Sequence, residues 1–179
     1  NATGQATLPT STLPAGPRTI LASYAGDANV FSSRSSSLPL SVAKAATTTT
    51  LTSSVNLSVT GQPVALTATV GLVAPSVGLP TGTVTFHDGP IELGTAPLAP
   101  IGGIATASFS TALAVGTHGL PASFSGDANT RPNAPAPRMQ TVARAATSVT
   151  LTTSPSTVVL GQPVTFTAAL GVLPPGAGS

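Results

Sequence analysis

The chain repeats itself at an interval of 100 residues, and this repeat constrains the fold more than any other feature. Residues 45–54 return as residues 145–154, and residues 13–78 align with residues 113–178 without a gap. Self-similarity at a fixed interval is the signature of proteins built from tandem structural units, in which each unit contacts mainly its neighbours. The sequence therefore predicts a series of similar units.

The interval divides the chain into three pieces. Residues 46–145 make one complete repeat, residues 1–45 match the later part of a repeat, and residues 146–179 match the early part of another. Residues 80–100 have no counterpart in either end piece. We therefore expect the C-terminal part of one unit, a complete unit, and the N-terminal part of a further unit, in a segment cut from a longer protein.

Within the complete repeat, apolar residues alternate with polar ones over short stretches. Such a period of two is typical of half-buried strands, and stretches of Gly, Pro, Asp and Asn that form turns separate them. No helical period persists. The pattern predicts strands near residues 47–53, 63–71, 82–87, 91–96, 104–110, 118–124 and 138–144.

Seven short strands in one repeat are typical of an immunoglobulin-like sandwich of two antiparallel sheets. The sequence thus predicts an all-β fold, with immunoglobulin-like antiparallel β-sandwich repeats in tandem. The chain has no Cys and no Trp, so aliphatic side chains and Phe must fill the core. Pro121 should occupy an edge or a position that donates no hydrogen bond. The expected buried residues are Leu66, Val84, Phe86, Phe109, Leu120 and Phe124.

Several motifs of the complete repeat resemble those of bacterial Ig-like repeats in large exported proteins. They are Thr-Leu-Thr-Ser-Ser at 50–54, Gly-Gln-Pro-Val at 61–64, Gly-Thr-Val-Thr-Phe-His-Asp-Gly at 82–89, Leu-Gly at 93–94, Val-Gly-Thr-His at 115–118 and Phe-Ser-Gly-Asp-Ala-Asn at 124–129. The resemblance implies a β-sandwich in a long secreted or surface-attached protein, often an adhesin, and it supplies no catalytic residues. Pro121 and the Pro-rich stretch 131–138 depart from the pattern.

The low charge of the chain bears on its partners. Charged residues are 6% of the chain, the net charge is +2, and the basic residues lie far apart. A nucleic-acid-binding protein needs a dense basic face to neutralise phosphates, so we expect no nucleic-acid partner. No apolar run approaches the roughly 18 residues that cross a bilayer, so we expect no membrane insertion in this segment.

Few residues are available for catalysis. The only acidic residues and histidines are Asp27, Asp88, Glu92, Asp127, His87 and His118. His87 and Asp88 are neighbours, but successive residues of a strand point to opposite faces, which does not suit a base and the residue that orients it. We therefore expect no catalytic residues and no enzyme.

The motif Gly-Asp-Ala-Asn occurs twice and offers the best candidate for a metal site. Asp and Asn suit a tight turn because their side chains accept hydrogen bonds from nearby backbone. The same pairs, Asp27 with Asn29 and Asp127 with Asn129, also make weak calcium candidates. Calcium takes six to eight oxygen ligands, and each loop offers one carboxylate. The turn interpretation is therefore preferred, and no metal or cofactor is expected.

These observations favour a structural or adhesive repeat module of a large extracellular or cell-surface protein, acting as a rod-like spacer or a filament-forming element. The alternatives are a ligand-binding adhesin module and an accessory domain of a secreted enzyme. The expected partners are the neighbouring Ig-like repeats in the same chain. The joints near residues 42–45 and 142–145 are short, so we expect limited bending.

The end pieces add a second kind of partner. Residues 1–45 should supply the last three strands of a sandwich, and residues 146–179 the first two. Each piece would expose an apolar face and unpaired strand edges, which recruit other chains. Two outcomes follow from this. The pieces can associate head to tail, which builds filaments because such a contact does not close on itself. Alternatively, and this is the preferred interpretation, the ends are arbitrary boundaries and stay poorly packed.

Overall fold

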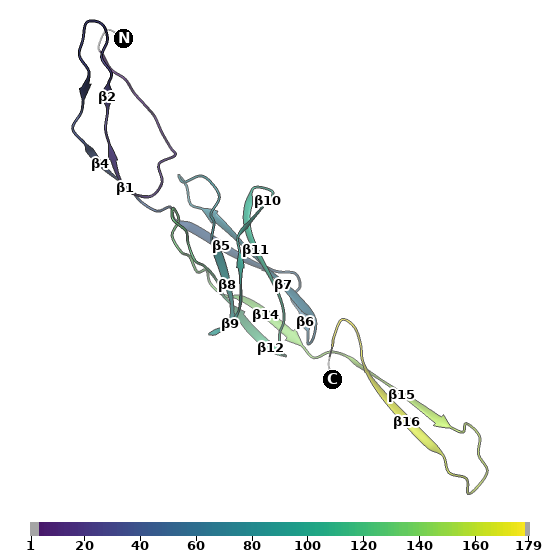
Figure 1. Cartoon of the computed structure of the whole chain (residues 1–179). Coiled ribbons are helices and arrows are strands. Elements are labelled where there is room, and N and C mark those ends of the chain that lie inside the picture. The colour runs from purple at the N-terminus through teal and green to yellow at the C-terminus, as the bar shows by residue number, and fades with distance from the viewer. Residues whose placement is uncertain (1–3, 178–179) are drawn as a thin grey trace.

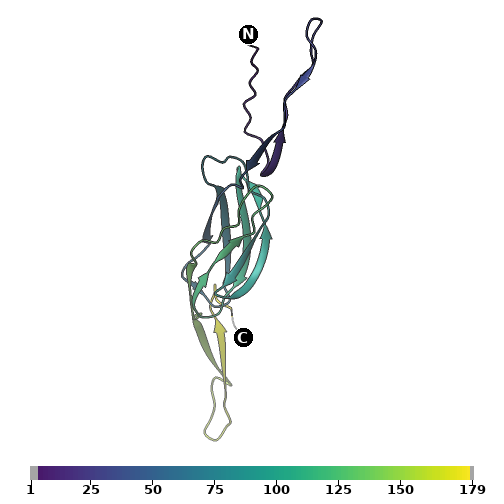
Figure 2. The ribbon, with the colours of Figure 1, turned by 90° about the vertical axis from the view of Figure 1, so that its left-hand side faces the viewer.

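A computed structural model describes residues 4–177, and these form sixteen β-strands and no helix. The all-β fold class is therefore confirmed. The strands make an elongated molecule with a sandwich in the middle and one long hairpin at each end (Figure 1). Figure 2 shows the same extended outline after a turn of 90°. Since the described residues contain no helix, none of them forms a helix that could cross a membrane.

The first layer of the sandwich is a four-stranded antiparallel sheet with β7 and β11 at its centre. The long alternation of apolar and polar residues in β7 matches its pattern of buried and exposed positions. Strands β5 and β11 flank β7 on its two sides, and β10 pairs with β11 at the edge. The bounds are β5 (Thr47–Ser53), β7 (Pro63–Leu72), β10 (Ala99–Ile101) and β11 (Ile104–Ala112).

The second layer consists of two three-stranded sets, ordered β13-β8-β9 and β12-β14-β6. Within it, β14 pairs with β12 antiparallel and with β6 parallel. The N–H of Gly89 donates to the carbonyl of Gly119 at 2.9 Å, which joins the two sets. The bounds are β6 (Ser58–Val59), β8 (Thr83–Asp88), β9 (Ile91–Pro97), β12 (Gly116–Leu120), β13 (Ala122–Phe124) and β14 (Arg138–Ala143).

All seven strands expected in the complete repeat form, and one of them is interrupted. Pro121 divides the strand expected over residues 118–124 into β12 and β13, which pair with β14 and β8 respectively. Its nitrogen carries no hydrogen to donate, while its carbonyl accepts from the N–H of His87 at 3.0 Å. The chain therefore changes its pairing partner at the residue that cannot donate. The short strands β6 and β10 were not expected from the alternation.

The core lies between the two layers and confirms five of the six expected residues. Leu66, Val84, Phe86 and Leu120 have no exposed surface, and Phe124 is 2% exposed. Phe109 is only partly buried, so its expected burial is wrong in degree. Its ring stacks on Phe86 with centroids 5.6 Å apart and lies over Gly94, where a Cβ atom would come within 2.5 Å of the ring. Phe109 therefore covers the rim of the core.

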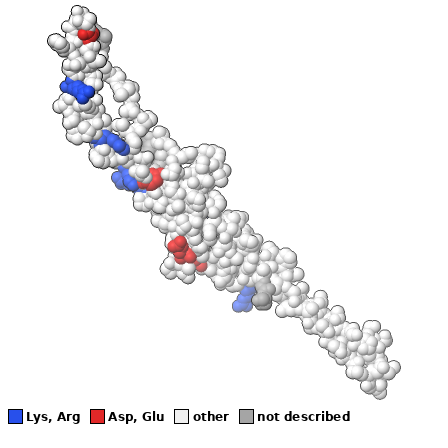
Figure 3. All heavy atoms as spheres, viewed as in Figure 1, with Lys and Arg blue, Asp and Glu red and all other residues white. Residues whose placement is uncertain are grey.

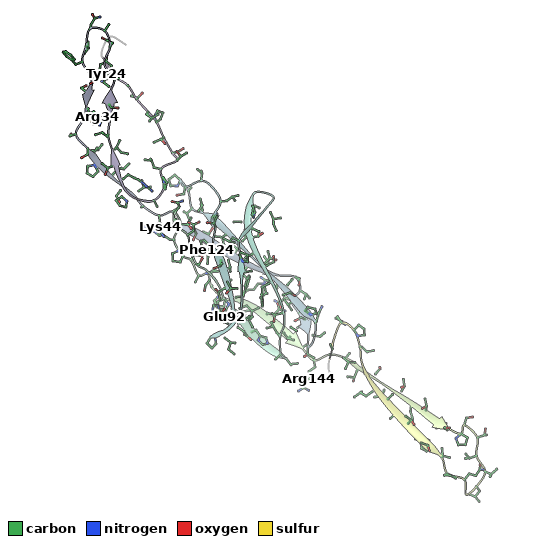
Figure 4. All side chains as sticks on the ribbon, in the orientation of Figure 1. Tyr24, Arg34, Lys44, Glu92, Phe124 and Arg144 are labelled. Carbon is green, nitrogen blue, oxygen red and sulfur yellow. The ribbon has the colours of Figure 1, made fainter. Side chains whose placement is uncertain are left out.

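The end pieces keep strand pairing but lack an opposing layer. The N-terminal hairpin contains β1 (Gly16–Ile20), β2 (Ser23–Tyr24), β3 (Ser33–Arg34) and β4 (Leu38–Val42), and the C-terminal hairpin contains β15 (Thr147–Ser154) and β16 (Thr165–Val172). Phe166 is 66% exposed, whereas its counterpart Leu66 is fully buried. Figure 4 shows Tyr24 on the end hairpin and its counterpart Phe124 within the sandwich.

One expectation for the N-terminal piece is wrong. The sequence predicts three strands from residues 1–45, but residues 4–10, the counterpart of β11, form none. In the complete repeat β11 pairs with β7 and β10. The chain holds no counterparts of those two strands beside residues 4–10, so their backbone has no ladder to join. The C-terminal piece forms the two strands expected.

Candidate functional site

Charged side chains are sparse on the surface and form no concentrated patch in the view of Figure 3. Among the described residues, no three of His, Cys, Asp and Glu gather as a metal site would require. His87 and Asp88, for which the sequence suggested no catalytic role, are neighbours at the end of β8, and the side chain of Asp88 lies against His118 instead. The candidates therefore reduce to a His–Asp pair elsewhere and to the two Gly-Asp-Ala-Asn loops.

Asp88 pairs with His118, a residue that the sequence reasoning did not connect to it. The Nδ1 atom of His118 lies 2.7 Å from Oδ2 of Asp88, and Nε2 lies 2.9 Å from the carbonyl oxygen of Ala114. The two residues are brought together because β8 and β12 lie side by side in the second layer. An Asp directly after the expected strand 82–87 and a His at the start of the expected strand 118–124 are the only signal that the sequence offered.

The geometry gives the pair of His118 and Asp88 a structural role. Both ring nitrogens of His118 face acceptors, so both contacts are hydrogen bonds only when both nitrogens carry hydrogen. A general base needs a free nitrogen within reach of the proton it removes. Neither nitrogen is free here, and the pair instead ties the β8–β9 turn to the loop between β11 and β12.

We expect the stability of the sandwich to fall as the pH rises above the ordinary pKa of histidine. Burial lowers the pKa of His118, but the hydrogen bonds to Ala114 and Asp88 outweigh it and raise the pKa above 6.5. The folded state thus holds the proton more tightly, and this stabilisation is complete below the unfolded pKa and lost as the pH rises through the folded pKa. Urea unfolding at about pH 5.5 and about pH 8.5 measures the difference.

Two variants identify the group responsible for this pH dependence. His118→Gln should remove most of the difference in urea midpoint between the two pH values, while His87→Gln should leave it intact. An undiminished difference in His118→Gln would show that another group titrates on unfolding.

The Gly-Asp-Ala-Asn loop of the complete repeat is closed by its own carboxylate. Oδ1 of Asp127 accepts from the N–H groups of Asn129 and Thr130, each at 2.8 Å. Oδ2 accepts from the N–H and the hydroxyl of Thr81, also at 2.8 Å. Burial raises the pKa of Asp127, but these hydrogen bonds outweigh it and hold the pKa well below its ordinary range.

The N-terminal loop has the same construction. Oδ1 of Asp27 accepts from the N–H groups of Asn29 at 2.7 Å and Val30 at 2.9 Å, and Oδ2 accepts from the hydroxyl of Tyr24 at 3.0 Å. The bonds from Asn29, Tyr24 and Val30 lower the pKa of Asp27. The two loops therefore share one local structure, as expected from the repeated motif.

We expect calcium to leave the stability of the chain unchanged. The oxygens of Asp27 and Asp127 already accept hydrogen bonds, and each loop has one carboxylate for a cation that takes six to eight oxygens. Thermal melts with millimolar Ca²⁺ and with a chelator should therefore coincide. An upward shift of the melting temperature with Ca²⁺, lost in Asp127→Asn, would show that the loop binds the ion.

The loop of the complete repeat also contacts the N-terminal piece. Oδ1 of Asn129 accepts from the N–H of Ala15 at 3.0 Å, and Nζ of Lys44 donates to the carbonyl of Asp127 at 2.6 Å. The carbonyl of Asn129 accepts from the N–H of Ala45 at 2.8 Å. An open groove of about 600 Å³ runs beside these contacts, between residues 11–15 and residues 75–79.

The complete repeat contacts the C-terminal piece through the turn at Thr60. The N–H of Thr60 donates to the carbonyl of Ala143 at 2.9 Å, at the end of β14. Its carbonyl accepts from the N–H of Ala177 at 3.1 Å. The backbone of a single residue, Thr60, thus links the last strand of the complete repeat to a loop of the piece that follows.

Comparison with known proteins adds one positive finding. Residues 46–143 match a family model described as Bacterial Ig-like domain (group 3), and the match covers more than half of the chain. No curated protein and no solved structure matched the chain.

Proposed function

The chain belongs to the bacterial Ig-like domain (group 3) family, and from this premise we propose that it is a rod-like spacer in an extracellular or cell-surface protein. Domains of this family commonly occur in surface or exported proteins and are typically non-enzymatic. A spacer needs extended shape and stiff connections, and it needs no cluster of reactive side chains.

The observation that carries the proposal is that both linkers are short and that the first is held by hydrogen bonds. Only residues 43–46 separate β4 from β5, and only residues 144–146 separate β14 from β15. The N–H of Ala45 donates to Asn129, and the carbonyl of Ala45 accepts from the N–H of Arg131 at 2.9 Å. A short linker whose backbone is hydrogen-bonded to the sandwich that follows it resists bending, which supports a stiff connection between successive units.

Small-angle scattering tests the spacer on this chain and on a longer chain with residues 46–145 inserted once more in phase. The maximum dimension should grow by at least about 30 Å, because the ten residues of β7 rise about 3.3 Å each. An unchanged dimension, or a compact form of the longer chain, would contradict a rod.

A second proposal is self-association through the end pieces, and exposed apolar residues favour it. In the complete repeat, Leu66 of β7 is buried against the second layer, whereas its counterpart Phe166 is 66% exposed. The N-terminal hairpin carries Ile20 and Tyr24, the counterparts of two buried residues in that second layer. The C-terminal hairpin of one copy therefore offers a face that matches the N-terminal hairpin of another.

Light scattering over a concentration series tests the self-association. Long species should grow with concentration, and Phe166→Ser should abolish them. Strictly monomeric behaviour at high concentration would contradict self-association and would leave the spacer unaffected.

A further inference from the structure

We propose that successive repeats are locked by two contacts, and that each joint of this chain displays one of them. In the first contact, the Asn of the Gly-Asp-Ala-Asn loop binds the preceding repeat. In the second, the Thr-Gly turn of the preceding repeat binds a loop of the following one. The inference deepens the proposed spacer and rests on it, because it names the residues that would stiffen the rod.

The first contact is present at the joint before the complete repeat. The Asn129 side chain accepts from the N–H of Ala15 at 3.0 Å, and the guanidinium group of Arg18 donates to the carbonyl of Ala15 at 3.0 Å. The ammonium group of Lys44, in the linker, donates to the carbonyl of Asp127. The loop of one repeat is thereby hydrogen-bonded both to the preceding repeat and to the linker between them.

The second contact is present at the joint after the complete repeat. Ala177 approaches Gly61 so closely that a Cβ atom on Gly61 would lie 2.5 Å from the carbonyl oxygen of Ala177. Gly61 also has φ +79°, which L side chains rarely adopt. Gly161 has φ +91° but has nothing within 4 Å of a Cβ position. The two glycines thus share a backbone conformation, and only Gly61 meets a neighbouring repeat.

The 100-residue interval places both contacts in one complete joint. Val77 is the counterpart of Ala177, yet it is 84% exposed and lines the groove at the first joint. Val115 is the counterpart of Ala15, and it is 51% exposed at the second joint. At the first joint Val77 is exposed, whereas its counterpart Ala177 makes the second contact. At the second joint Val115 is exposed, whereas its counterpart Ala15 makes the first contact. The groove at the first joint is therefore the place that the Thr-Gly turn of a preceding complete repeat would occupy.

Paired spin labels measure the stiffness of each joint directly. Because the chain has no cysteine, two exposed positions at a time can be changed to Cys and labelled. Thr19→Cys with Ser110→Cys reports on the first joint, and Ser110→Cys with Thr152→Cys reports on the second. Electron–electron dipolar spectroscopy should give one narrow distance peak at each joint.

Matched variants assign the contacts. Lys44→Ala with Asn129→Ala should abolish the narrow peak at the first joint only, while the counterpart change, Arg144→Ala with Asn29→Ala, should leave it. Gly61→Ala should abolish the narrow peak at the second joint only, with Gly161→Ala as the control.

A further variant covers the case in which Gly61→Ala unfolds the sandwich. Ala177→Pro removes the N–H that donates to the carbonyl of Thr60, and residue 177 lies outside the sandwich. This variant should also abolish the narrow peak at the second joint. Narrow peaks that survive all three changes would overturn the assigned contacts and would leave the spacer standing. Broad distributions in the unaltered chain would overturn the spacer as well.

Discussion

Phe124→Ala should lower the free energy of unfolding of the sandwich by about 3–5 kcal/mol, the range found when a buried Phe is truncated. Phe124 is 2% exposed and lies on β13 opposite Val84 of β8. Much of the surrounding core is Val, Ala and Leu, and small side chains held on paired strands cannot move in to fill the space of a lost ring. Since domains of this size are stable by about 5–15 kcal/mol, the loss should be large in proportion.

Urea denaturation followed by far-UV circular dichroism measures this loss. The counterpart variant, Tyr24→Ala, provides the control because Tyr24 is 47% exposed on the end hairpin. It should leave the transition of the sandwich where it is. A loss below about 1 kcal/mol in Phe124→Ala would mean that the core relaxes around the missing ring.

The strands of the complete repeat follow from the alternation in the sequence, because one buried face imposes a period of two on every strand. The expected range 47–53 is the observed β5, and 91–96 differs from β9 by one residue. The core residues on these strands follow for the same reason. Phe109 follows the alternation but is only partly buried, because its ring packs over Gly94 at the rim of the core.

The alternation of apolar and polar residues could not predict the side-chain contacts between distant segments. Asp88 and His118 meet because β8 and β12 are neighbours in space, and a repeat interval says nothing of which strands lie side by side. The bond from Ala15 to Asn129 joins residues 114 positions apart. A motif predicts a turn from local chemistry, whereas a contact between two pieces depends on how they are placed.

The end pieces show that strands can pair without their apolar side chains being buried. β15 and β16 pair over eight residues, as β5 and β7 do over seven, so the local sequence is sufficient for the hairpin. Burial requires a second layer, which the end pieces lack, and Leu151 and Leu170 stay exposed although they alternate like core residues. The alternation thus predicts which face is apolar, and the rest of the repeat decides whether that face is covered.

A second large effect is expected at Asp127, where Asp127→Ala should destabilise the sandwich by about 2–3 kcal/mol. The substitution removes the acceptor of four hydrogen bonds and leaves the N–H groups of Thr81, Asn129 and Thr130 without it. A hydrogen bond to an ionised group contributes about 1.5–3 kcal/mol, and the sum is reduced here because the loop is partly exposed to solvent. Thermal and urea unfolding measure the loss, and Asp27→Ala should not shift the same transition.

The charge of Asp127 should also appear in the acid stability of the sandwich. Its pKa lies below the ordinary value of 3.8. The stabilisation is therefore present above that unfolded value and is lost as the pH falls through the folded pKa. Asp127→Asn keeps an oxygen for the N–H groups of Asn129 and Thr130 but presents an amide to Thr81. It should be less stable than the unaltered chain at neutral pH and should lose less on acidification. Equal losses in both would place the acid sensitivity of the sandwich at a different carboxylate.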